Sequence, residues 1–416
     1  MAKTQGRKLL LVSLDALSET EFEKLRHMKN FSRFIEKGSY SKGMQSVYPT
    51  QTYTVHTSVI TGCYPQKHFV YSNQFFQPFT DRKQREWFWY RHQIHGDTLY
   101  DAAAREGRRV CSILWPVSGK ANIKYNIPEI VAIKNESQAA KVLKNGSFLF
   151  VLKSEILHGH HRQGIRQPML DEFAVTCAAD AAKAHTPDLV MLHLVSIDAA
   201  KHNFGVKSQM VDEALKNLDG MIGNLLEAFS DYTIIMFSDH GQIDVEYDVY
   251  INQFLSDNGM LDFAAKTYDA YIECDDGCGI VRAKNDEQMQ RALKLIEKNM
   301  GMLGIEAIYG EKELAEHKVG CGIEHMLEMK AGYSLKDGQS EKIVRSLKDE
   351  GRVHATHGYS PQKENYKCVF FAMGEQIAQG REIGEMSVVD IAPTAARILG
   401  LDEFKCDGRE IDEIFK

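Results

Sequence analysis

The chain has 416 residues, which is too long for one simple core and suggests two or three structural units. Hydrophobic residues make up 44% of the chain and charged residues 26%, as in an ordinary folded protein. The net charge of −7 argues against nucleic acid polymers and anionic membranes as bulk partners. A small anionic ligand would need local metal ions or cationic side chains to attract it.

The apolar run at residues 9–14, which follows a basic segment at 1–8, is too short for the core of a signal peptide. No apolar stretch approaches the roughly 20 residues of a membrane span, so no membrane association is predicted. Eight cysteines are scattered without a disulfide framework. They predict reduced thiols and a cytoplasmic location. The sequence carries no signal of oligomeric state.

Short apolar runs alternate with longer amphipathic segments, which predicts an α/β fold. The expected buried strands are residues 8–14, 109–114, 189–195, 233–237 and 367–373. The expected helices are residues 21–37, 52–61, 98–106, 170–185, 208–229 and 388–399. Residues 75–86 and 121–166 are expected to be irregular surface segments.

The pattern changes between residues 261 and 352. Residues 268–283 alternate like antiparallel strands around a turn at 275–277, and residues 287–299 and 340–350 predict helices. This predicts a smaller inserted α+β domain at 261–352 that covers the crevice as a cap. The catalytic core would then be discontinuous, with parts at 1–260 and 353–416.

Acidic and histidine side chains follow three of the predicted strands. Asp15 follows the first, Asp198 and His202 follow 189–195, and Asp239 and His240 follow 233–237. Ligands of open α/β sheets bind beyond the carboxyl ends of the strands. Asp and His are ligands for Zn²⁺ and Mn²⁺, and the i, i+4 spacing puts Asp198 and His202 on one face of a helical turn.

Each residue alone has a simpler structural explanation, such as a helix N-cap or a surface ion pair. Together with His357, in a glycine-bearing loop at 355–359, they favour a metal site. A further cluster at His158, His160 and His161 is expected to be a solvated loop rather than another metal site.

The segment 48–58 is rich in Thr and Ser hydroxyls and contains Pro49 just before a predicted helix. A hydroxyl at a helix N-terminus is favoured as a nucleophile by the dipole and by free N–H groups. Position alone does not choose among Thr50, Thr52 and Thr54, and an ordinary N-cap is the alternative.

The motifs occur in a specific order along the chain: Val12-Ser13-Leu14-Asp15, Tyr48-Pro49-Thr50-Gln51-Thr52-Tyr53-Thr54-Val55-His56, Thr61-Gly62-Cys63-Tyr64-Pro65-Gln66-Lys67-His68, Asp198 with His202, Ser238-Asp239-His240-Gly241 and Thr356-His357-Gly358. In this the chain resembles the alkaline phosphatase superfamily, and within it the type I phosphodiesterase/nucleotide pyrophosphatase branch. The resemblance implies an alkaline-phosphatase-like core with a mostly parallel central sheet and helices on both faces.

The resemblance also implies the site. One divalent metal ion would be bound by Asp198, His202 and His357, and a second by Asp15, Asp239 and His240, with Thr52 approaching it as the nucleophile. Both ions are expected to be Zn²⁺, with Mn²⁺ or Fe as alternatives. Asn73 would donate to a phosphoryl oxygen, and Tyr53 would lie beside the leaving group or, equally, pack in the core.

The resemblance further implies hydrolysis of phosphodiester or pyrophosphate bonds in small phosphorylated, nucleotide-type substrates, through a phosphothreonine intermediate. The chain departs from the family at Gln51, where Lys is usual, at Thr54-Val55, where Pro-Asn is usual, and at Phe69, where Gly is usual. These departures concern the substrate pocket and leave every ligand position intact.

Several alternatives share the two-metal pattern. They are a phosphonoacetate hydrolase-like C–P hydrolase, a phosphomonoesterase with Arg85 or Lys67 as an added cation, and, more distantly, a phosphoglycerate or phosphopentose mutase. A sulfatase is disfavoured because no Cys-x-Pro-x-Arg segment is present. A metal-dependent phosphate-binding scaffold without activity is a remote alternative.

Overall fold

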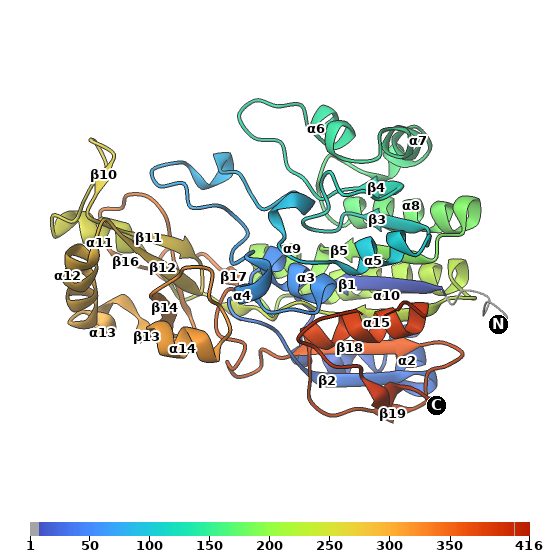
Figure 1. Ribbon diagram of the computed structural model, residues 1–416. Coiled ribbons are helices and arrows are strands. Elements are labelled where there is room, and N and C mark those ends of the chain that lie inside the picture. The colour runs from blue at the N-terminus through green and yellow to red at the C-terminus, as the bar shows by residue number, and fades with distance from the viewer. Residues whose placement is uncertain (1–7, 403) are drawn as a thin grey trace.

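The structure is a computed structural model that describes residues 8–402 and 404–416. Most of the basic segment at the N-terminus, residues 1–7, lies outside the described residues. In the described part, a central sheet of nine strands runs in the order β19-β2-β18-β6-β1-β5-β3-β4, and β20 also pairs with β2 (Figure 1). These strands are β1 Leu9–Leu14, β2 Ser39–Gln45, β3 Val110–Ile113, β4 Tyr125–Ile127, β5 Leu189–Leu194, β6 Thr233–Phe237, β18 Cys368–Met373, β19 Arg381–Glu382 and β20 Met386–Ser387.

The middle of this sheet is parallel. Strand β1 pairs in parallel with β5 and β6, and β3 pairs in parallel with β5 and β4, whereas β18 is antiparallel to β6 and β2. All residues of β1, β5 and β6 are buried, as expected for parallel strands covered on both faces. The predicted α/β fold with a mostly parallel sheet is therefore confirmed.

Alternate residues of β1 point to opposite faces and enter two different cores. Leu10, Val12 and Leu14 pack with α8 Met169–His185 and α10 Gln209–Ala228. Leu9 and Leu11 pack on the other face with α3 Thr52–Thr61, α5 Leu99–Arg105 and α15 Ile391–Leu399. Helices cover both faces of the sheet, as Figure 1 shows.

The predicted helix at 21–37 is wrong as a single element. The structure has two short helices, α1 Phe22–Leu25 and α2 Phe31–Lys37. The break is stabilised by Asp219 of α10, whose Oδ1 accepts the backbone N–H groups of Asn30 at 2.9 Å and Phe31 at 3.0 Å. The Asp219 carboxylate of α10 therefore caps the N-terminus of α2 and makes it a separate helix. Local periodicity does not reveal a cap that comes from a distant helix.

A second group of strands lies beside the carboxyl end of the main sheet (Figure 1). Four antiparallel strands run in the order β11 Ala270–Asp275, β12 Cys278–Ala283, β14 Met326–Met329 and β13 Ile305–Tyr309. The predicted hairpin at 268–283 and the helix after it, α12 Asp286–Glu297, are therefore present. This region has its own apolar core.

The helix predicted at 340–350 is wrong. Instead β16 Val344–Ser346 pairs with β8 Tyr247–Val249, which also pairs with β15 Tyr333–Leu335. Because β8 and α11 Ile251–Asp257 pack in the core of the second region, its contacts extend to residues before 261. The domain division at 261 and 352 stays a prediction, and these contacts favour an earlier first boundary.

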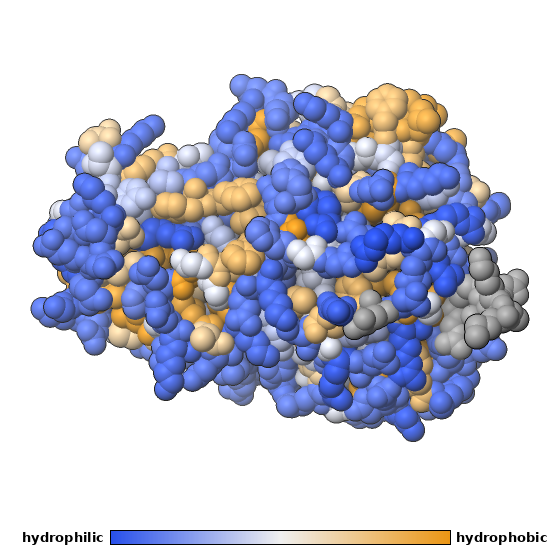
Figure 2. All heavy atoms as spheres, viewed as in Figure 1, coloured by the Kyte–Doolittle hydropathy of each residue, from blue (hydrophilic) through white to orange (hydrophobic). Residues whose placement is uncertain are grey.

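The segment 121–166, predicted to be irregular, contains a strand, β4, and three helices. It contains α6 Gln138–Asn145 and α7 Phe148–His158, followed by the short helix η4 Gly159–His161. Hydrophobic side chains gather on the surface over α7 (Figure 2), among them Leu149 and Ile156, which are 78% and 73% exposed. None of the described helices combines the length and apolar character that a bilayer crossing requires.

Candidate metal centre and nucleophile

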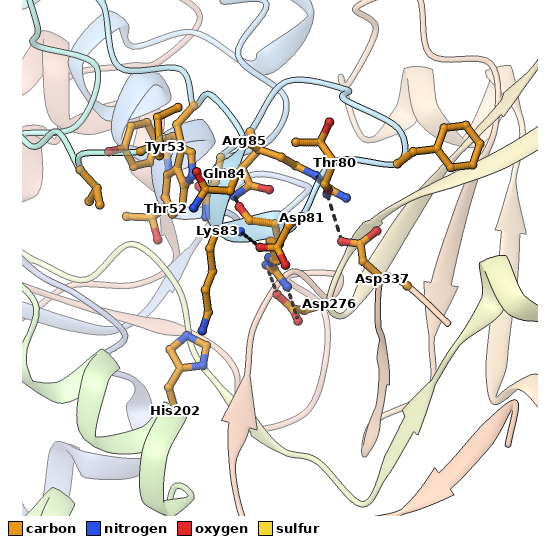
Figure 3. Close-up of a pocket in the computed structure, with 18 of the residues that line it drawn as sticks. Thr52, Tyr53, Thr80, Asp81, Lys83, Gln84, Arg85, His202, Asp276 and Asp337 are labelled. Carbon is orange, nitrogen blue, oxygen red and sulfur yellow. Dashed lines mark hydrogen bonds and ion pairs between the residues drawn. The ribbon is translucent and has the colours of Figure 1, made fainter. Parts of the chain in front are cut away.

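A cavity of about 1130 Å³ opens where the carboxyl ends of β1, β5 and β6 meet the second group of strands. Several residues predicted to form the site line it: Asp15, Thr52, Tyr53, Asn73, Asp198, His202 and His357. Figure 3 shows Thr52 and His202 in this cavity, with the segment 80–85 as one wall. Asp239 and His240 lie behind it, fully buried.

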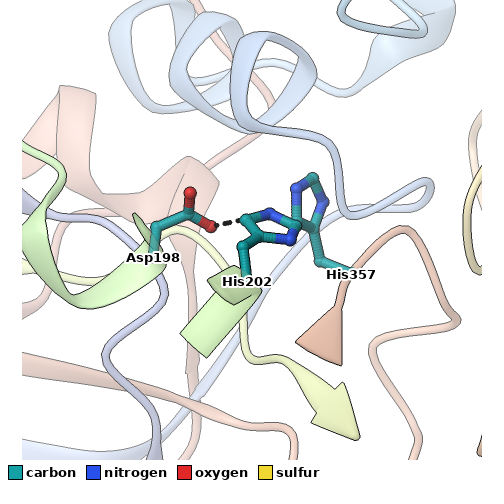
Figure 4. A group of neighbouring side chains, drawn as sticks. All are labelled: Asp198, His202 and His357. Carbon is teal, nitrogen blue, oxygen red and sulfur yellow. Dashed lines mark ion pairs between the residues drawn. The ribbon is translucent and has the colours of Figure 1, made fainter. Parts of the chain in front are cut away.

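Asp198, His202 and His357 form one compact group (Figure 4). Asp198 and His202 lie on consecutive turns of α9 Ser196–Phe204, directly after β5, and Asp198 Oδ1 is 3.3 Å from His202 Nε2. His357 reaches them from the loop after β17 Ala355–Thr356. One ligand atom from each residue lies within 4.8 Å of the other two, a spacing that allows a shared cation.

Asp15, Asp239 and His240 form the second group. His240 Nε2 is 3.4 Å from Asp15 Oδ1 and 3.3 Å from Asp239 Oδ2. Asp15 follows β1, and Asp239 and His240 follow β6, so the pairing of β1 with β6 brings them together. Asp198 also lies within 4.8 Å of Asp15 and His240, so the two groups are adjacent.

The three imidazoles of the site are oriented in the same way. The Nδ1 atom of His202 lies 2.8 Å from the carbonyl oxygen of Ala355, and that of His357 lies 3.0 Å from the oxygen of Thr50. His240 Nδ1 lies 3.2 Å from the oxygen of its neighbour, Gly241. Donation from Nδ1–H to a carbonyl leaves the lone pair of Nε2 free, the usual arrangement of a metal-binding histidine.

The loop that carries His357 packs closely on the second group of strands. Gly358 has φ +96°, and a Cβ at this position would lie 2.3 Å from the carbonyl oxygen of Asp275. Only glycine fits there without displacing β11. The hairpin of β11 and β12 therefore helps to fix the position of His357, one of the candidate ligands.

The carboxylates of the second group are crowded. Burial and the neighbouring charges of Asp239 and Asp198 hold the pKa of Asp15 well above its usual value. Burial raises the pKa of Asp239 to about 6. Burial lowers the pKa of His240 to about 4 and that of His357 to about 3, so both imidazoles are neutral near pH 7. Neutral imidazoles beside repelling carboxylates suit divalent cations.

Within the first group, the pair of Asp198 and His202 shows the opposite balance. Burial alone would raise the pKa of Asp198 and lower that of His202. Their mutual charge attraction and hydrogen bond outweigh burial, so the pKa of Asp198 is lowered and that of His202 is raised.

Two buried carboxylate oxygens without donors indicate that these residues fit divalent cations. Asp15 Oδ1 and Asp239 Oδ2 are both buried and have no hydrogen-bond partner in the described part of the chain. A buried carboxylate oxygen without a donor is costly, and both atoms face His240 Nε2. A cation between these oxygens and the imidazole would satisfy both.

The three candidate threonines have different environments. The Thr50 hydroxyl donates to the carbonyl oxygen of Tyr359 at 2.7 Å and accepts the N–H of Gly358 at 3.1 Å. Thr54 is fully buried. Thr52, at the first position of α3, lines the cavity, and its Oγ1 lies 3.2 Å from His240 Nε2. The geometry therefore favours Thr52 among the three.

The Asn73 side chain is held at both ends. Its Oδ1 accepts the backbone N–H of Tyr53 at 2.8 Å, and its Nδ2 donates to Gln51 Oε1 at 3.0 Å. Gln51 in turn donates from Nε2 to the carbonyl oxygen of Asp275 at 2.9 Å, which fixes both amides in this orientation. Asn73 Nδ2 keeps one more N–H, and the residue lines the same cavity as Thr52.

Tyr53 lies at the cavity wall but is almost fully buried. Its ring is 1% exposed and packs edge-on against Trp87, with the ring centroids 5.3 Å apart. Its hydroxyl is 3.4 Å from Glu129. This burial favours the packing role over contact with a leaving group.

Sequence reasoning missed a second layer of polar residues around the ligands. His193, in the otherwise apolar strand β5, lies between two carboxylates: its Nε2 is 3.0 Å from Asp15 Oδ2, and its Nδ1 is 2.8 Å from Glu129 Oε2. Although burial opposes it, these two contacts hold the pKa of His193 well above its usual value. The sequence signal that could have revealed this role is His193 itself, a histidine within an otherwise apolar strand.

The cations considered for a monoesterase are both in ion pairs. Arg85 lines the cavity but donates to Asp337 at 3.0 Å, and Lys67 pairs with Asp407 away from the cavity. The histidine cluster at 158–161 ends α7 and forms η4, so the predicted loop is wrong there. None of the metal-type groups found among the described residues includes it.

The chain therefore has an alkaline-phosphatase-like fold: a mostly parallel α/β sheet with an Asp/His cluster, the candidate metal centre, beyond the carboxyl ends of its strands. The sequence model of one family within this fold class, type I phosphodiesterase/nucleotide pyrophosphatase, matches residues 9–360. The chain belongs to this family.

Curated relatives share part of their length with the chain. Human ectonucleotide pyrophosphatase/phosphodiesterase family member 1 is 28% identical over 241 residues, which cover 54% of this chain and 22% of the relative. Venom phosphodiesterase 2 of Crotalus adamanteus is 23% identical over 259 residues, covering 58% and 27%. The chain thus matches about a quarter of the length of these relatives.

Solved structures resemble the whole chain. Human ectonucleotide pyrophosphatase/phosphodiesterase 5 has a TM-score of 0.71 at 15% identity, covering 99% of this chain and 100% of the other. The murine protein, solved as an inactive threonine-to-alanine variant in complex with AMP, has a TM-score of 0.69 at 15% identity with the same coverage. At this identity the likeness concerns the fold.

Proposed function

We propose that the chain hydrolyses phosphodiester or pyrophosphate bonds of small nucleotide-type substrates, with Thr52 as the nucleophile. The observation that carries the proposal is the Thr52 hydroxyl, 3.2 Å from His240 Nε2, the atom that two buried carboxylate oxygens without donors also face. Family membership and the AMP complex of the murine structural neighbour support a nucleotide as substrate.

Two divalent cations are proposed to bind here, Zn²⁺ in the first place, with Mn²⁺ or Fe as alternatives. Asp198, His202 and His357 would hold one cation, and Asp15, Asp239 and His240 the other. When bound, such cations lower the pKa of a neighbouring hydroxyl and neutralise charge on phosphoryl oxygens.

The residues of the chain perform the rest of the reaction. Thr52 Oγ1 loses its proton to solvent and forms a bond to phosphorus, while the bond from phosphorus to the leaving oxygen breaks and the leaving group departs into the open cavity, where solvent protonates it as its own pKa requires. The position of Thr52 at the first residue of the ten-residue helix α3 favours the negative charge that develops. Water then attacks the phosphothreonine and releases the product, which restores the Thr52 hydroxyl.

Asn73 supplies a neutral donor for the transition state. One N–H of Nδ2 is bonded to Gln51 and the other is proposed to donate to a phosphoryl oxygen. Because Oδ1 is held by the N–H of Tyr53, the amide is positioned relative to Thr52 before substrate binds. A neutral donor suits a diester, which carries one negative charge at phosphorus.

A reducing compartment such as the cytoplasm is proposed as the location. All eight cysteines are free thiols. Cys274 and Cys278 are both buried and point to opposite faces of the β11–β12 hairpin, because Cys274 pairs with Gly279 and Cys278 with Asp275. Such thiols fit a location that does not form disulfides.

The test compares substrates on the purified, metal-loaded chain. We expect a higher kcat/KM for a nucleotide diester, such as the p-nitrophenyl ester of thymidine 5′-monophosphate, than for p-nitrophenyl phosphate or phosphonoacetate. Thr52→Ala should abolish turnover but retain bound metal, and Thr50→Ser serves as the matched control. Preference for the monoester or for phosphonoacetate would replace the diesterase assignment, and full activity of Thr52→Ala would exclude Thr52 as the nucleophile.

A further inference from the structure

One wall of the cavity is the segment 80–85, which includes the short helix η2 Arg82–Gln84 (Figure 3). Asp81 begins this helix by accepting the backbone N–H of Lys83 at 2.8 Å. Gln74 Nε2 donates to the carbonyl oxygen of Arg82 at 3.1 Å. The backbone is therefore held at Lys83 itself and at the preceding residue, Arg82.

Two ion pairs fasten the same segment to the second group of strands. Arg82 forms a bidentate pair with Asp276, at 3.1 and 2.6 Å, and Arg85 donates to Asp337 at 3.0 Å. Asp276 and Asp337 are largely buried, with 7% and 14% of their side chains exposed. Both guanidinium groups thus have carboxylate partners, and neither has an uncompensated charge for a substrate.

Lys83 lies between these two arginines and differs from them. Its side chain has no acidic partner in the described part of the chain. Figure 3 shows it extending toward His202, away from Asp276 and Asp337, and it lines the same cavity as Thr52, Asp198 and His357. An uncompensated ammonium group therefore faces the candidate metal centre.

The charges of the cavity indicate what this ammonium group would bind. A diester has one negative charge at phosphorus, which the proposed cations and Asn73 already face. A phosphate group adjacent to the scissile phosphorus adds further negative charge, and Arg82 and Arg85, the guanidinium groups on either side of Lys83 in the sequence, are already paired with carboxylates. Lys266 also lines the cavity, but from the turn between β9 Leu261–Asp262 and β10 Thr267–Tyr268, at the outer edge of the second region (Figure 1).

We propose that Lys83 binds a phosphate group adjacent to the scissile phosphorus and is thereby the residue that favours phosphoanhydrides, such as nucleoside di- and triphosphates, over diesters that lack this group. This inference rests on the proposed function and narrows its substrate class. Lys83 contacts the non-reacting phosphate through a charge-assisted hydrogen bond. The arginine pairs on either side hold Lys83 in place and leave its charge available.

The first experiment separates the substrate classes by activity. Lys83→Met should lower kcat/KM for ATP by about tenfold to a hundredfold, the loss expected for one hydrogen bond to a charged group. It should leave kcat/KM for the p-nitrophenyl ester of thymidine 5′-monophosphate unchanged. Lys83→Arg should retain most of the activity on ATP, and the difference between substrates should shrink as salt is raised.

Lys134→Met is the matched control. Lys134 is exposed and close to the same segment, because its backbone N–H donates to Gln84 Oε1 at 2.7 Å, but its ammonium group faces Glu86 at 3.6 Å outside the cavity lining. Removing this charge should affect both substrates equally and weakly. An equal loss on ATP and on the diester in Lys83→Met, or no loss on either, would overturn the inference. So would a loss confined to a monoester.

A binding measurement separates failure of the inference from failure of the proposed function. In zinc-loaded Thr52→Ala protein, calorimetric Kd values for AMP and ADP are compared with and without Lys83→Met. We expect ADP to weaken by about tenfold or more and AMP to change little. If the wild-type chain hydrolyses no phosphoester yet ADP binding depends on Lys83, the proposed function fails and the inference stands. Equal Kd changes for AMP and ADP, or none, refute it.

Discussion

Replacing Gln51 tests whether the donor geometry at the active site depends on residues that never touch the substrate. Gln51 is completely buried, donates to the carbonyl oxygen of Asp275 and accepts from Asn73 Nδ2 at 3.0 Å. In Gln51→Ala, Asn73 keeps only its contact with the N–H of Tyr53 at 2.8 Å and can rotate away from the phosphoryl oxygen. The effect should appear in kcat rather than in metal content.

The magnitude follows from the hydrogen bonds involved. Loss of a transition-state donor lowers kcat by about 10²–10³-fold, so Asn73→Ala should fall in that range. Gln51→Ala removes one net hydrogen bond of about 1 kcal/mol from a donor that stays present, so we expect a decrease of about five- to tenfold. Because Gln51 acts through Asn73, the double variant should be no slower than Asn73→Ala alone.

Steady-state kinetics on a nucleotide diester give these values. The control is Gln77→Ala, since Gln77 lies on the nearby segment but bonds only to backbone groups of Phe75 and Glu86. Losses in Gln51→Ala and Asn73→Ala that multiply in the double variant would refute the reasoning, because they would show that the two residues act independently.

Three further predictions concern metal content, stability and pH. His202→Ala should reduce bound metal, measured by atomic emission, from two equivalents per chain to about one, because it removes a ligand of only one proposed cation; two equivalents retained would contradict that ligand set. Lys201 is buried and donates to Glu21 at 2.8 Å, so Lys201→Met should lower the free energy of unfolding, measured in denaturant, by about 3–5 kcal/mol. An unchanged midpoint would contradict this, because it would show that the charge of Glu21 does not depend on Lys201. Burial raises the pKa of Asp275 to about 8, above its unfolded value, so the folded state binds the extra proton and the contribution of this one group to wild-type stability falls as pH rises from about 4 to 8, by at most about 1.4 kcal/mol per pH unit. Asp275→Asn should lack this decrease and gain on the wild type between pH 6 and 8, whereas parallel stability curves would contradict it.

The parts of the fold predicted best were those set by local pattern. The helix Thr52–Thr61 has the predicted bounds because its start is clearly marked in the sequence. The strand Thr233–Phe237 has the predicted bounds because it is an uninterrupted apolar run. The helix α7 was missed because it is apolar on both its buried and its exposed sides, so no amphipathic stripe marks it. The strand β16 was missed because it exists only through pairing with β8.

The candidate site shows the same division. Asp15, Asp198 and Asp239 were accessible to sequence reasoning because parallel strands deliver their ends to one edge of the sheet. The roles of Gln51 and Lys83 were not, because each depends on contacts between distant segments. Gln51 is 224 residues from its partner Asp275, and the arginines beside Lys83 pair with residues 194 and 252 positions away.

The stereochemical course at phosphorus tests the covalent role of Thr52 most directly. A nucleotide diester made chiral with sulfur and oxygen isotopes is hydrolysed by the metal-loaded chain, and the configuration of the product is read by phosphorus NMR. Attack by Thr52 followed by attack of water inverts phosphorus twice, so overall retention is predicted. Inversion would mean a single displacement by water and would contradict the phosphothreonine intermediate.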